Sequence, residues 1–215
     1  MRTDSQIVVD LPRREIMLDC LKKECLACRA CPIGGRGLDG SEWNWDGESE
    51  PSPISNVFSS GDVSCELVVV GQNPGRDEVL VGRPFIGASG RFFDKVLLEE
   101  VGLGRDQVYV TNVVKCFTPG NRAPTPEEVG SCQGFLRREF EIVKPKMVLA
   151  LGSYAFRALT GMSGITKHCG EIVHSIRFGV PVLACLHPSP YNTNNPEKRG
   201  MFMSALGVLR AALDA

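Results

Sequence analysis

The sequence has almost no charge imbalance and no long hydrophobic run. Its 24 Lys and Arg residues and 25 Asp and Glu residues leave a net charge of −1. This excludes a general polycation but allows nucleic acid to bind at a local basic face. No apolar run approaches the ~18 residues of a membrane helix. Residues 1–15 include acidic side chains and lack the apolar core of a secretion signal, so we expect a cytoplasmic protein without a membrane partner.

Internal repeats are also absent, and the length limits the architecture. A chain of 215 residues has room for one α/β domain with a substantial core. We therefore expect a single domain over residues 1–215. Residues 37–55 are acidic, rich in Gly, Ser and Pro, and include Trp43 and Trp45, which indicates a surface insertion. The tryptophans could dock on the domain or stack on a base or partner, and we favour docking.

Apolar runs alternate with amphipathic segments through the rest of the chain. The runs predict buried strands at residues 67–70, 108–111, 147–151 and 180–185. Helical patterns cover residues 13–23, 88–100, 125–144, 153–159 and 196–213. Residues 72–87 are expected to form a loop. The alternation predicts a three-layer α/β/α fold with a central four-stranded parallel sheet.

Polar residues follow three of these predicted strands. Gln72 and Asn73 come after the first strand, Asn112 after the second and His187 after the fourth. Because the carboxyl ends of parallel strands meet at one edge of a sheet, these side chains can converge on one pocket. The glycine-rich stretch 71–90 would let the backbone approach a ligand closely.

Each of these positions also has a purely structural interpretation. Asn73 precedes a proline and could shape a turn, and Asn112 could cap a loop backbone. His187 could be a hydrogen-bonded structural histidine, and Phe85 could be part of the core. The convergence of all four positions favours a binding site.

The chain has nine cysteines, which is many for an intracellular protein. An odd number at uneven spacing does not indicate a disulfide framework, and a metal site is the better first hypothesis. Cys25, Cys28 and Cys31 are separated by two-residue gaps, which let adjacent thiolates reach one metal centre. Cys116 and Cys132 are candidate partners downstream. Alternatively, these are unrelated buried thiols.

An ordered set of motifs resembles the iron–sulfur uracil-DNA glycosylases, called family 4. The family has a glycine-rich first motif, a Cys-x-x-Cys-Pro signature, a Thr-Asn-Val-Val-Lys-Cys segment, a helical cysteine and a late His-Pro-Ser. The matching segments are residues 71–90, 28–33, 111–124 with Thr118 as the one mismatch, Cys132, and 187–189. The resemblance covers nearly the whole chain outside residues 37–55.

This resemblance implies a [4Fe–4S] cluster. It assigns the ligands to Cys28, Cys31, Cys116 and Cys132, which makes Cys25 a spare thiol, although spacing alone does not choose between Cys25 and its neighbours. The cluster would tie the amino-terminal segment to the second strand and the following helix, and we expect its role to be structural.

The resemblance also implies a reaction on a base that has left the DNA helix. Phe85 would stack on the flipped base, and Asn112 would read its edge. His187 would stabilise the leaving uracil anion. Gly75 and Ser189, in the first and last motifs, would contact the substrate.

The sequence departs from the family pattern at Gln72 and Asn73, where family 4 has Glu and then Ala or Gly. Asparagine at this third position is similar to the mismatch-specific and thymine DNA glycosylases, where it positions the attacking water. We therefore expect Asn73 to orient water with help from Glu78, while Gln72 contacts the substrate. The loop at residues 190–195 and Cys169 also differ from the family. Together these changes suggest an altered substrate, such as a 5-modified or mismatched pyrimidine.

DNA is the expected partner, bound by a monomer, with Lys115, Arg122 and Lys198 as phosphate contacts. The pocket motifs lack a lysine that could form a Schiff base, so we expect a monofunctional DNA N-glycosylase. Two alternatives stay open: a transferase that modifies a flipped hypermodified pyrimidine, and a non-catalytic module that binds DNA bases.

Overall fold

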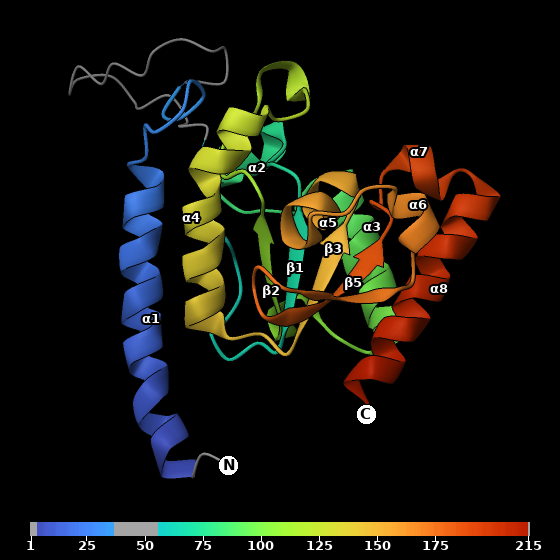
Figure 1. Ribbon diagram of the computed structural model, residues 1–215, viewed down its shortest axis with the longest axis horizontal. Coiled ribbons are helices and arrows are strands. Elements are labelled where there is room, and N and C mark those ends of the chain that lie inside the picture. The colour runs from blue at the N-terminus through green and yellow to red at the C-terminus, as the bar shows by residue number, and fades with distance from the viewer. Residues whose placement is uncertain (1–3, 37–55, 215) are drawn as a thin grey trace.

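The protein folds around a central sheet with helices on both faces, as the computed structural model shows (Figure 1). The structure describes residues 4–36 and 56–214, so the expected insertion at 37–55, with Trp43 and Trp45, lies outside the described residues. The strands are β1 (Leu67–Gly71), β2 (Val108–Asn112), β3 (Met147–Leu151), β4 (Ile172–Ser175) and β5 (Val180–Cys185). The α-helices are α1 (Asp4–Leu26), α2 (Arg76–Val81), α3 (Ala88–Val96), α4 (Pro126–Val143), α5 (Ser153–Thr160), α6 (Ile165–His168), α7 (Pro190–Thr193) and α8 (Pro196–Leu213). A π-helical turn, η1 (Leu97–Val101), continues α3, and two 3₁₀ turns are η2 (Arg105–Gln107) and η3 (Pro119–Asn121).

The strand order is β2-β1-β3-β5-β4, with four parallel strands and β4 antiparallel to β5. The predicted three-layer α/β/α arrangement is confirmed, and each of the four predicted strands is present. The predicted number of strands is wrong, because β4 adds a fifth at the edge. Ile172 and His174 of β4 are exposed, so this strand lacks the continuous apolar run that marks a strand buried on both faces.

Both faces of the sheet are covered, which explains why its central strands are apolar throughout. Every residue of β1, β2 and β3 is buried. On one face α3 and α8 pack against Leu67, Val69 and Leu149, and on the other α4 and α5 pack against Val68 and Val148. Hydrophobic burial on both faces stabilises the sheet and aligns the carboxyl ends of its parallel strands at one edge.

Helices α4 and α8 lie where their sequence signals predict. Thr125 caps α4 by accepting from the Glu128 backbone N–H at 3.3 Å, while the Glu128 side chain accepts from the Thr125 N–H at 2.7 Å. The loop expected at residues 72–87 is only partly a loop, since it contains α2. This helix has six residues and buries only Val79, so its sequence lacks the repeating apolar pattern that predicts a helix. Helix α1 is longer than the predicted 13–23.

Helix α1 lies along the outer side of α4 (Figure 1). The Arg14 guanidinium donates to the Ile142 carbonyl at 2.5 Å and also reaches the carbonyls of Val143 and Val63. Leu21 is fully buried in the contact. Because these bonds satisfy carbonyls at the end of α4, they also cap that helix.

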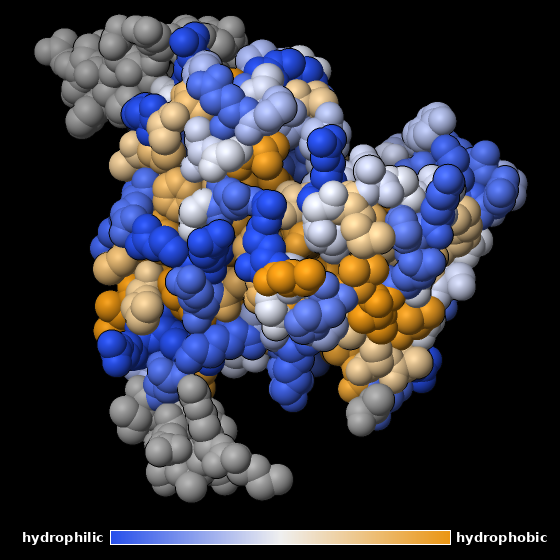
Figure 2. All heavy atoms as spheres, viewed as in Figure 1, coloured by the Kyte–Doolittle hydropathy of each residue, from blue (hydrophilic) through white to orange (hydrophobic). Residues whose placement is uncertain are grey.

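The surface seen in Figure 2 is hydrophilic over much of its area, with hydrophobic residues exposed lower on the same face. Its upper outline is notched to the left of α7, on the side toward which the parallel strands point. Among the described helices, none combines the length and apolar character needed to span a bilayer.

Candidate active site

A cavity of about 320 Å³ opens at the carboxyl ends of β1, β2 and β5. Loops that follow these three strands supply its walls, as expected for the ligand-binding edge of an open α/β sheet. The lining residues are Gln72, Asn73, Gly75, Glu78, Phe85, Gly87, Ala88, Ser89, Gly90, Asn112, Asn121 and His187. Of the predicted catalytic and substrate-binding residues, all but Ser189 lie in this lining.

Phe85 forms one wall of the cavity in an unusual backbone conformation. Its φ is +57°, in the left-handed region that residues with a side chain rarely adopt, and its side chain is buried. Glycine at two neighbouring positions makes this possible. A Cβ on Gly90 would lie 1.9 Å from the Phe85 carbonyl oxygen, and one on Gly71 would lie 2.5 Å from its ring. Backbone strain that the surrounding structure holds in place is typical of functional sites.

Asn112 ends β2 directly beside Gly71 of β1. It is 2% exposed, yet neither its Nδ2 nor its Oδ1 has a hydrogen-bond partner within the described part of the chain. Buried polar groups are nearly always hydrogen-bonded, because an unmade bond costs about 1–3 kcal/mol. An amide that faces a cavity with both functions open is suited to a ligand offering one acceptor and one donor side by side.

His187 follows β5 and faces Phe85, with the two ring centroids 6.3 Å apart. Asn192 of α7 donates to the His187 carbonyl at 2.9 Å, which holds the loop in place. Burial lowers the pKa of His187 below its ordinary value of 6.5, because the charged imidazolium is poorly solvated there. The ring is therefore neutral at neutral pH and presents one N–H donor.

The Asn73 side chain lies within a chain of hydrogen bonds. Gln72 Nε2 donates to Asn73 Oδ1 at 2.9 Å. Asn73 Nδ2 in turn lies 3.1 Å from the Pro74 carbonyl, 3.3 Å from Thr118 Oγ1 and 3.4 Å from Asn121 Oδ1. The Asn73 nitrogen is fully engaged, whereas its oxygen keeps a lone pair for another donor.

Glu78 connects the two halves of the glycine-rich stretch. Its carboxylate accepts from the Gly75 N–H at 3.0 Å. Burial raises the pKa of Glu78, and hydrogen bonds from the backbone amides of Gly75, Phe85, Gly87 and Ile86 oppose that rise. The carboxylate thus holds the turn that carries Phe85.

The structure separates several other predicted residues from the cavity. Ser189 is the N-cap residue of α7, and its carbonyl accepts from the backbone N–H groups of Asn192 and Thr193. Arg122 forms an ion pair with Glu128 at 2.6 Å. Lys198 is half-buried, with its ammonium 4.1 Å from the centroid of the Tyr191 ring. Asn121, which does line the cavity, was missed by sequence analysis, although it lies in the segment 111–124 that matched the family.

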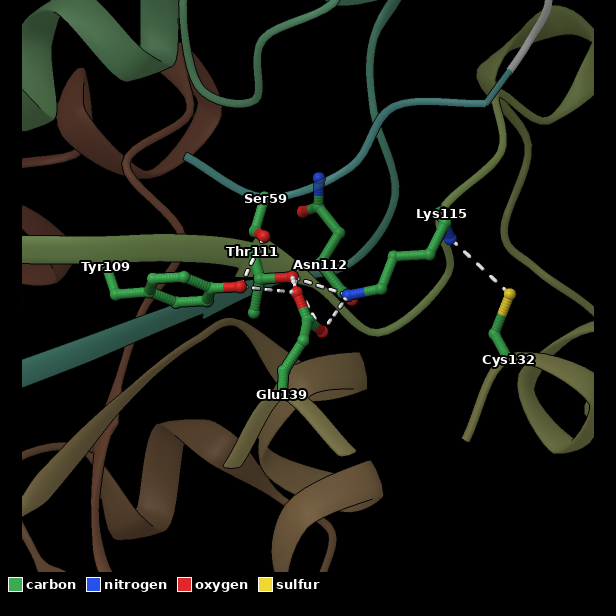
Figure 3. Close-up of polar contacts among 7 residues, drawn as sticks. All are labelled: Ser59, Tyr109, Thr111, Asn112, Lys115, Cys132 and Glu139. Atoms are coloured by element: carbon green, nitrogen blue, oxygen red, sulfur yellow. Dashed lines mark hydrogen bonds and ion pairs between the residues drawn. The ribbon is translucent and has the colours of Figure 1, made fainter. Parts of the chain in front are cut away.

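The prediction that Lys115 contacts phosphate is wrong, because its side chain is only 1% exposed. Figure 3 shows that it instead points toward Glu139 and Thr111. Its ammonium pairs with Glu139 of α4 at 2.5 Å and donates to the Asn112 carbonyl at 2.8 Å. Thr111 and Tyr109 also donate to the Glu139 carboxylate, at 2.9 and 3.1 Å. This buried network joins the end of β2 to α4.

Replacing Glu139 with Gln would leave the Lys115 ammonium buried without a counter-charge. We expect the free energy of unfolding to fall by about 3–5 kcal/mol, measured by urea denaturation. The matched control is Glu99→Gln, which breaks the exposed Lys95–Glu99 pair and should cost less than about 1 kcal/mol. Equal losses in the two variants would contradict a charged, desolvated Lys115.

The candidate metal-ligating thiols share one region beside this network, in which Cys116 and Cys132 are buried and Cys28 and Cys31 are half-buried. Burial raises the pKa of Cys116, and the nearby Cys132, Cys31, Cys25 and Cys28 raise it further by charge repulsion. Burial also raises the pKa of Cys132 to about 11. Within residues 4–36 and 56–214, however, no three His, Cys, Asp or Glu side chains already meet in an arrangement that could hold a metal ion.

Asn56 connects the amino-terminal cysteines to Cys116. Its side chain donates to the Cys25 carbonyl at 2.8 Å and accepts from the Gly35 N–H at 3.2 Å. Its backbone forms a bridge with Cys116. Gly34 lies against the backbone of the same loop, since a Cβ there would be 3.1 Å from the Cys28 carbonyl. These contacts bring segments far apart in the sequence together.

A family model described as the uracil DNA glycosylase superfamily matches residues 58–207. The chain belongs to the uracil-DNA glycosylase superfamily. The match spans every strand of the sheet and all three loops that line the cavity.

Several curated relatives are similar over most of their length. The type-4 uracil-DNA glycosylase of Archaeoglobus fulgidus is 34% identical, with 80% of this chain and 81% of the relative aligned. The type-4 uracil-DNA glycosylase of Thermotoga maritima is 33% identical, with 82% and 83% aligned. The type-5 uracil-DNA glycosylase of Pyrobaculum aerophilum is 40% identical, with 72% and 74% aligned. The predicted kinship with family 4 uracil-DNA glycosylases is confirmed.

The low pKa of His187 predicts a specific dependence of stability on pH. Between its folded pKa and the ordinary value of 6.5, the unfolded chain binds more protons at this residue, so stability falls as pH falls. We expect His187→Gln to lose less stability than the wild type when pH drops from above 6.5 to about 5. Urea denaturation at both pH values measures this difference. Glu78, whose raised pKa acts in the opposite direction, is common to both proteins and cancels; equal losses would contradict a buried neutral His187.

Proposed function

We propose that this protein is a DNA glycosylase that excises uracil, or a related pyrimidine, from DNA. The observation that carries the proposal is the buried Asn112 amide, which faces the cavity and has no hydrogen-bond partner for its donor or its acceptor among the described residues. The edge of uracil offers an adjacent O4 acceptor and N3–H donor. Membership of the superfamily and the names of the relatives support the same activity.

Recognition requires the base to leave the helix, at a cost of a few kcal/mol. The flipped base stacks on Phe85, whose left-handed backbone brings its ring beside the cavity. Asn112 Nδ2 donates to O4, and Asn112 Oδ1 accepts from N3–H. Cytosine presents the reverse pattern on this edge, so it would lose both bonds as long as the Asn112 amide keeps this orientation.

The reaction is hydrolysis of the N-glycosidic bond. The bond between C1′ and N1 breaks, the oxygen of a water molecule bonds to C1′, and uracil leaves with the electron pair before it takes up a proton. Neutral His187 donates to O2, where negative charge develops, and backbone amides near Gln72 and Asn73 add to this stabilisation. Asn73 Oδ1 accepts a hydrogen bond from the attacking water, which releases its second proton to solvent once its oxygen has bonded to C1′. Glu78 assists by holding the adjoining backbone.

The cavity chemistry favours simple hydrolysis over lyase activity. No lysine is among the described residues that line it, and Lys115 is engaged with Glu139. We expect a monomer acting on intracellular DNA. Gly75 contributes its backbone, and Gln72 its side chain, to the wall that faces the substrate.

The test is incubation with an oligonucleotide carrying a single uracil, followed by alkali and gel electrophoresis. We expect the wild-type protein to leave strands that break only when alkali is added. Base release should be slower by about 100-fold or more in Asn112→Ala and in His187→Ala, the loss typical of removing one preorganised polar group. Asn112→Ala should bind the DNA but no longer prefer the uracil-containing strand.

Controls for this experiment are the remote variant Glu99→Gln and a cytosine oligonucleotide. Wild-type binding without release of any base would contradict the proposal. Mass spectrometry of the bound DNA would then distinguish a base-modifying transferase from a non-catalytic base-binding module.

We also propose that Cys28, Cys31, Cys116 and Cys132 hold a [4Fe–4S] cluster. The support is a thiol donor set gathered in one region and the buried positions of Cys116 and Cys132. When bound, such a cluster would cross-link the amino-terminal loop to the end of β2 and to α4, which is a structural contribution.

Cluster binding is tested by iron and acid-labile sulfide analysis of protein purified without oxygen. We expect about four of each per chain, with a brown visible absorbance. Cys116→Ser and Cys132→Ser should lose both, while Cys65→Ser, a buried cysteine elsewhere, should retain both. Cys25→Ser should also retain the cluster; an iron-free wild-type protein would contradict the proposal.

A further inference from the structure

Two residues that depart from the family motifs contact each other. Asn73 lies where family 4 has Ala or Gly, and Thr118 is the single mismatch in the segment 111–124. Asn73 Nδ2 lies 3.3 Å from Thr118 Oγ1 across two separate loops. Thr118 is fully buried, so its hydroxyl cannot exchange these protein partners for bulk water.

The Pro74 carbonyl and the Thr118 hydroxyl, 3.1 and 3.3 Å from Asn73 Nδ2, together determine which way the Asn73 amide faces. Thr118 Oγ1 donates to the Arg122 carbonyl at 2.5 Å, and a hydroxyl has only one hydrogen to donate. Toward Asn73 it can therefore only accept, which requires the amide nitrogen on that side. Reversing the amide would set Asn73 Oδ1 against the lone pairs of Thr118 Oγ1 and Nδ2 against the donor Gln72 Nε2.

We infer that Thr118 is a positioning residue that keeps the Asn73 carbonyl oxygen available to the attacking water. The inference rests on the proposed function, in which Asn73 Oδ1 accepts a hydrogen bond from that water. Gln72 Nε2 occupies one lone pair of this oxygen and leaves the other for the water. Thr118 thus acts through Asn73 and touches neither substrate nor water.

The kinetic test compares Thr118→Val, which removes the hydroxyl at nearly constant shape, with Thr118→Ser, which retains it. Under single-turnover conditions we expect uracil release to slow about tenfold in Thr118→Val, the size of one lost hydrogen bond, and to stay within about twofold in Thr118→Ser. In an Asn73→Ala background, Thr118→Val should cause no further loss, because the residue it positions is absent.

A readout independent of activity is the exchange of the Asn73 side-chain N–H hydrogens with solvent. NMR assigns this amide by its disappearance in Asn73→Ala. We expect slow exchange in the wild type and Thr118→Ser, and at least severalfold faster exchange in Thr118→Val. Thr160→Val is the matched control, since Thr160 also donates to a backbone carbonyl, at 2.7 Å, but lies outside the cavity lining.

The outcomes separate the inference from the proposed function. A wild type that releases no uracil refutes the proposed function, while the exchange rates still test the contact. Unchanged exchange in Thr118→Val overturns the inference. An equal slowing by Thr118→Val with and without Asn73 also overturns it, because the hydroxyl would then only support the loop.

Discussion

The buried ion pair between Lys115 and Glu139 is the contact on which the site depends. It joins the loop that leaves β2 to the middle of α4, and the Lys115 ammonium also holds the carbonyl of Asn112. On one side of this lysine the chain presents Asn112 to the cavity, and on the other it continues to Cys116. A desolvated charge pair with its hydrogen bonds completed tolerates few alternative arrangements. The ion pair therefore fixes both regions relative to the sheet.

The shape of the cavity depends on glycines that leave space for a neighbouring large side chain. Gly71 and Gly90 leave the space that Phe85 occupies, and Glu78 binds the amides of the turn that holds Phe85 in its strained conformation. Asn112 adds a second unfavourable contribution, since its buried amide has no hydrogen-bond partner within residues 4–36 and 56–214. The strained backbone of Phe85 and the unpaired amide of Asn112 thus both destabilise the empty cavity. A ligand that completes the hydrogen bonds of Asn112 can recover part of that free energy.

Much of the fold was predictable because a parallel strand that is buried on both faces of the sheet consists of a continuous apolar run. The edge strand β4 was missed, since its exposed Ile172 and His174 give no such run. Asn112 and His187 could be located because strand ends converge in a parallel sheet. The position of Asn121 in the cavity and the contact of Thr118 with Asn73 could not be predicted, since contacts between loops leave no periodic pattern in the sequence. Lys115 was misread because sequence shows a charge but not the burial caused by a partner on α4.

The contacts of Arg14 have a consequence for how the protein is made. Its carbonyl partners at Ile142 and Val143 lie at the end of α4, so α1 has no docking surface until that helix has left the ribosome. Cys28 and Cys31, on the loop after α1, are therefore synthesised well before α4, against which α1 docks. Any assembly that requires all four thiols therefore cannot begin before Cys132 has been synthesised, and until then the nascent chain carries thiols without their partners.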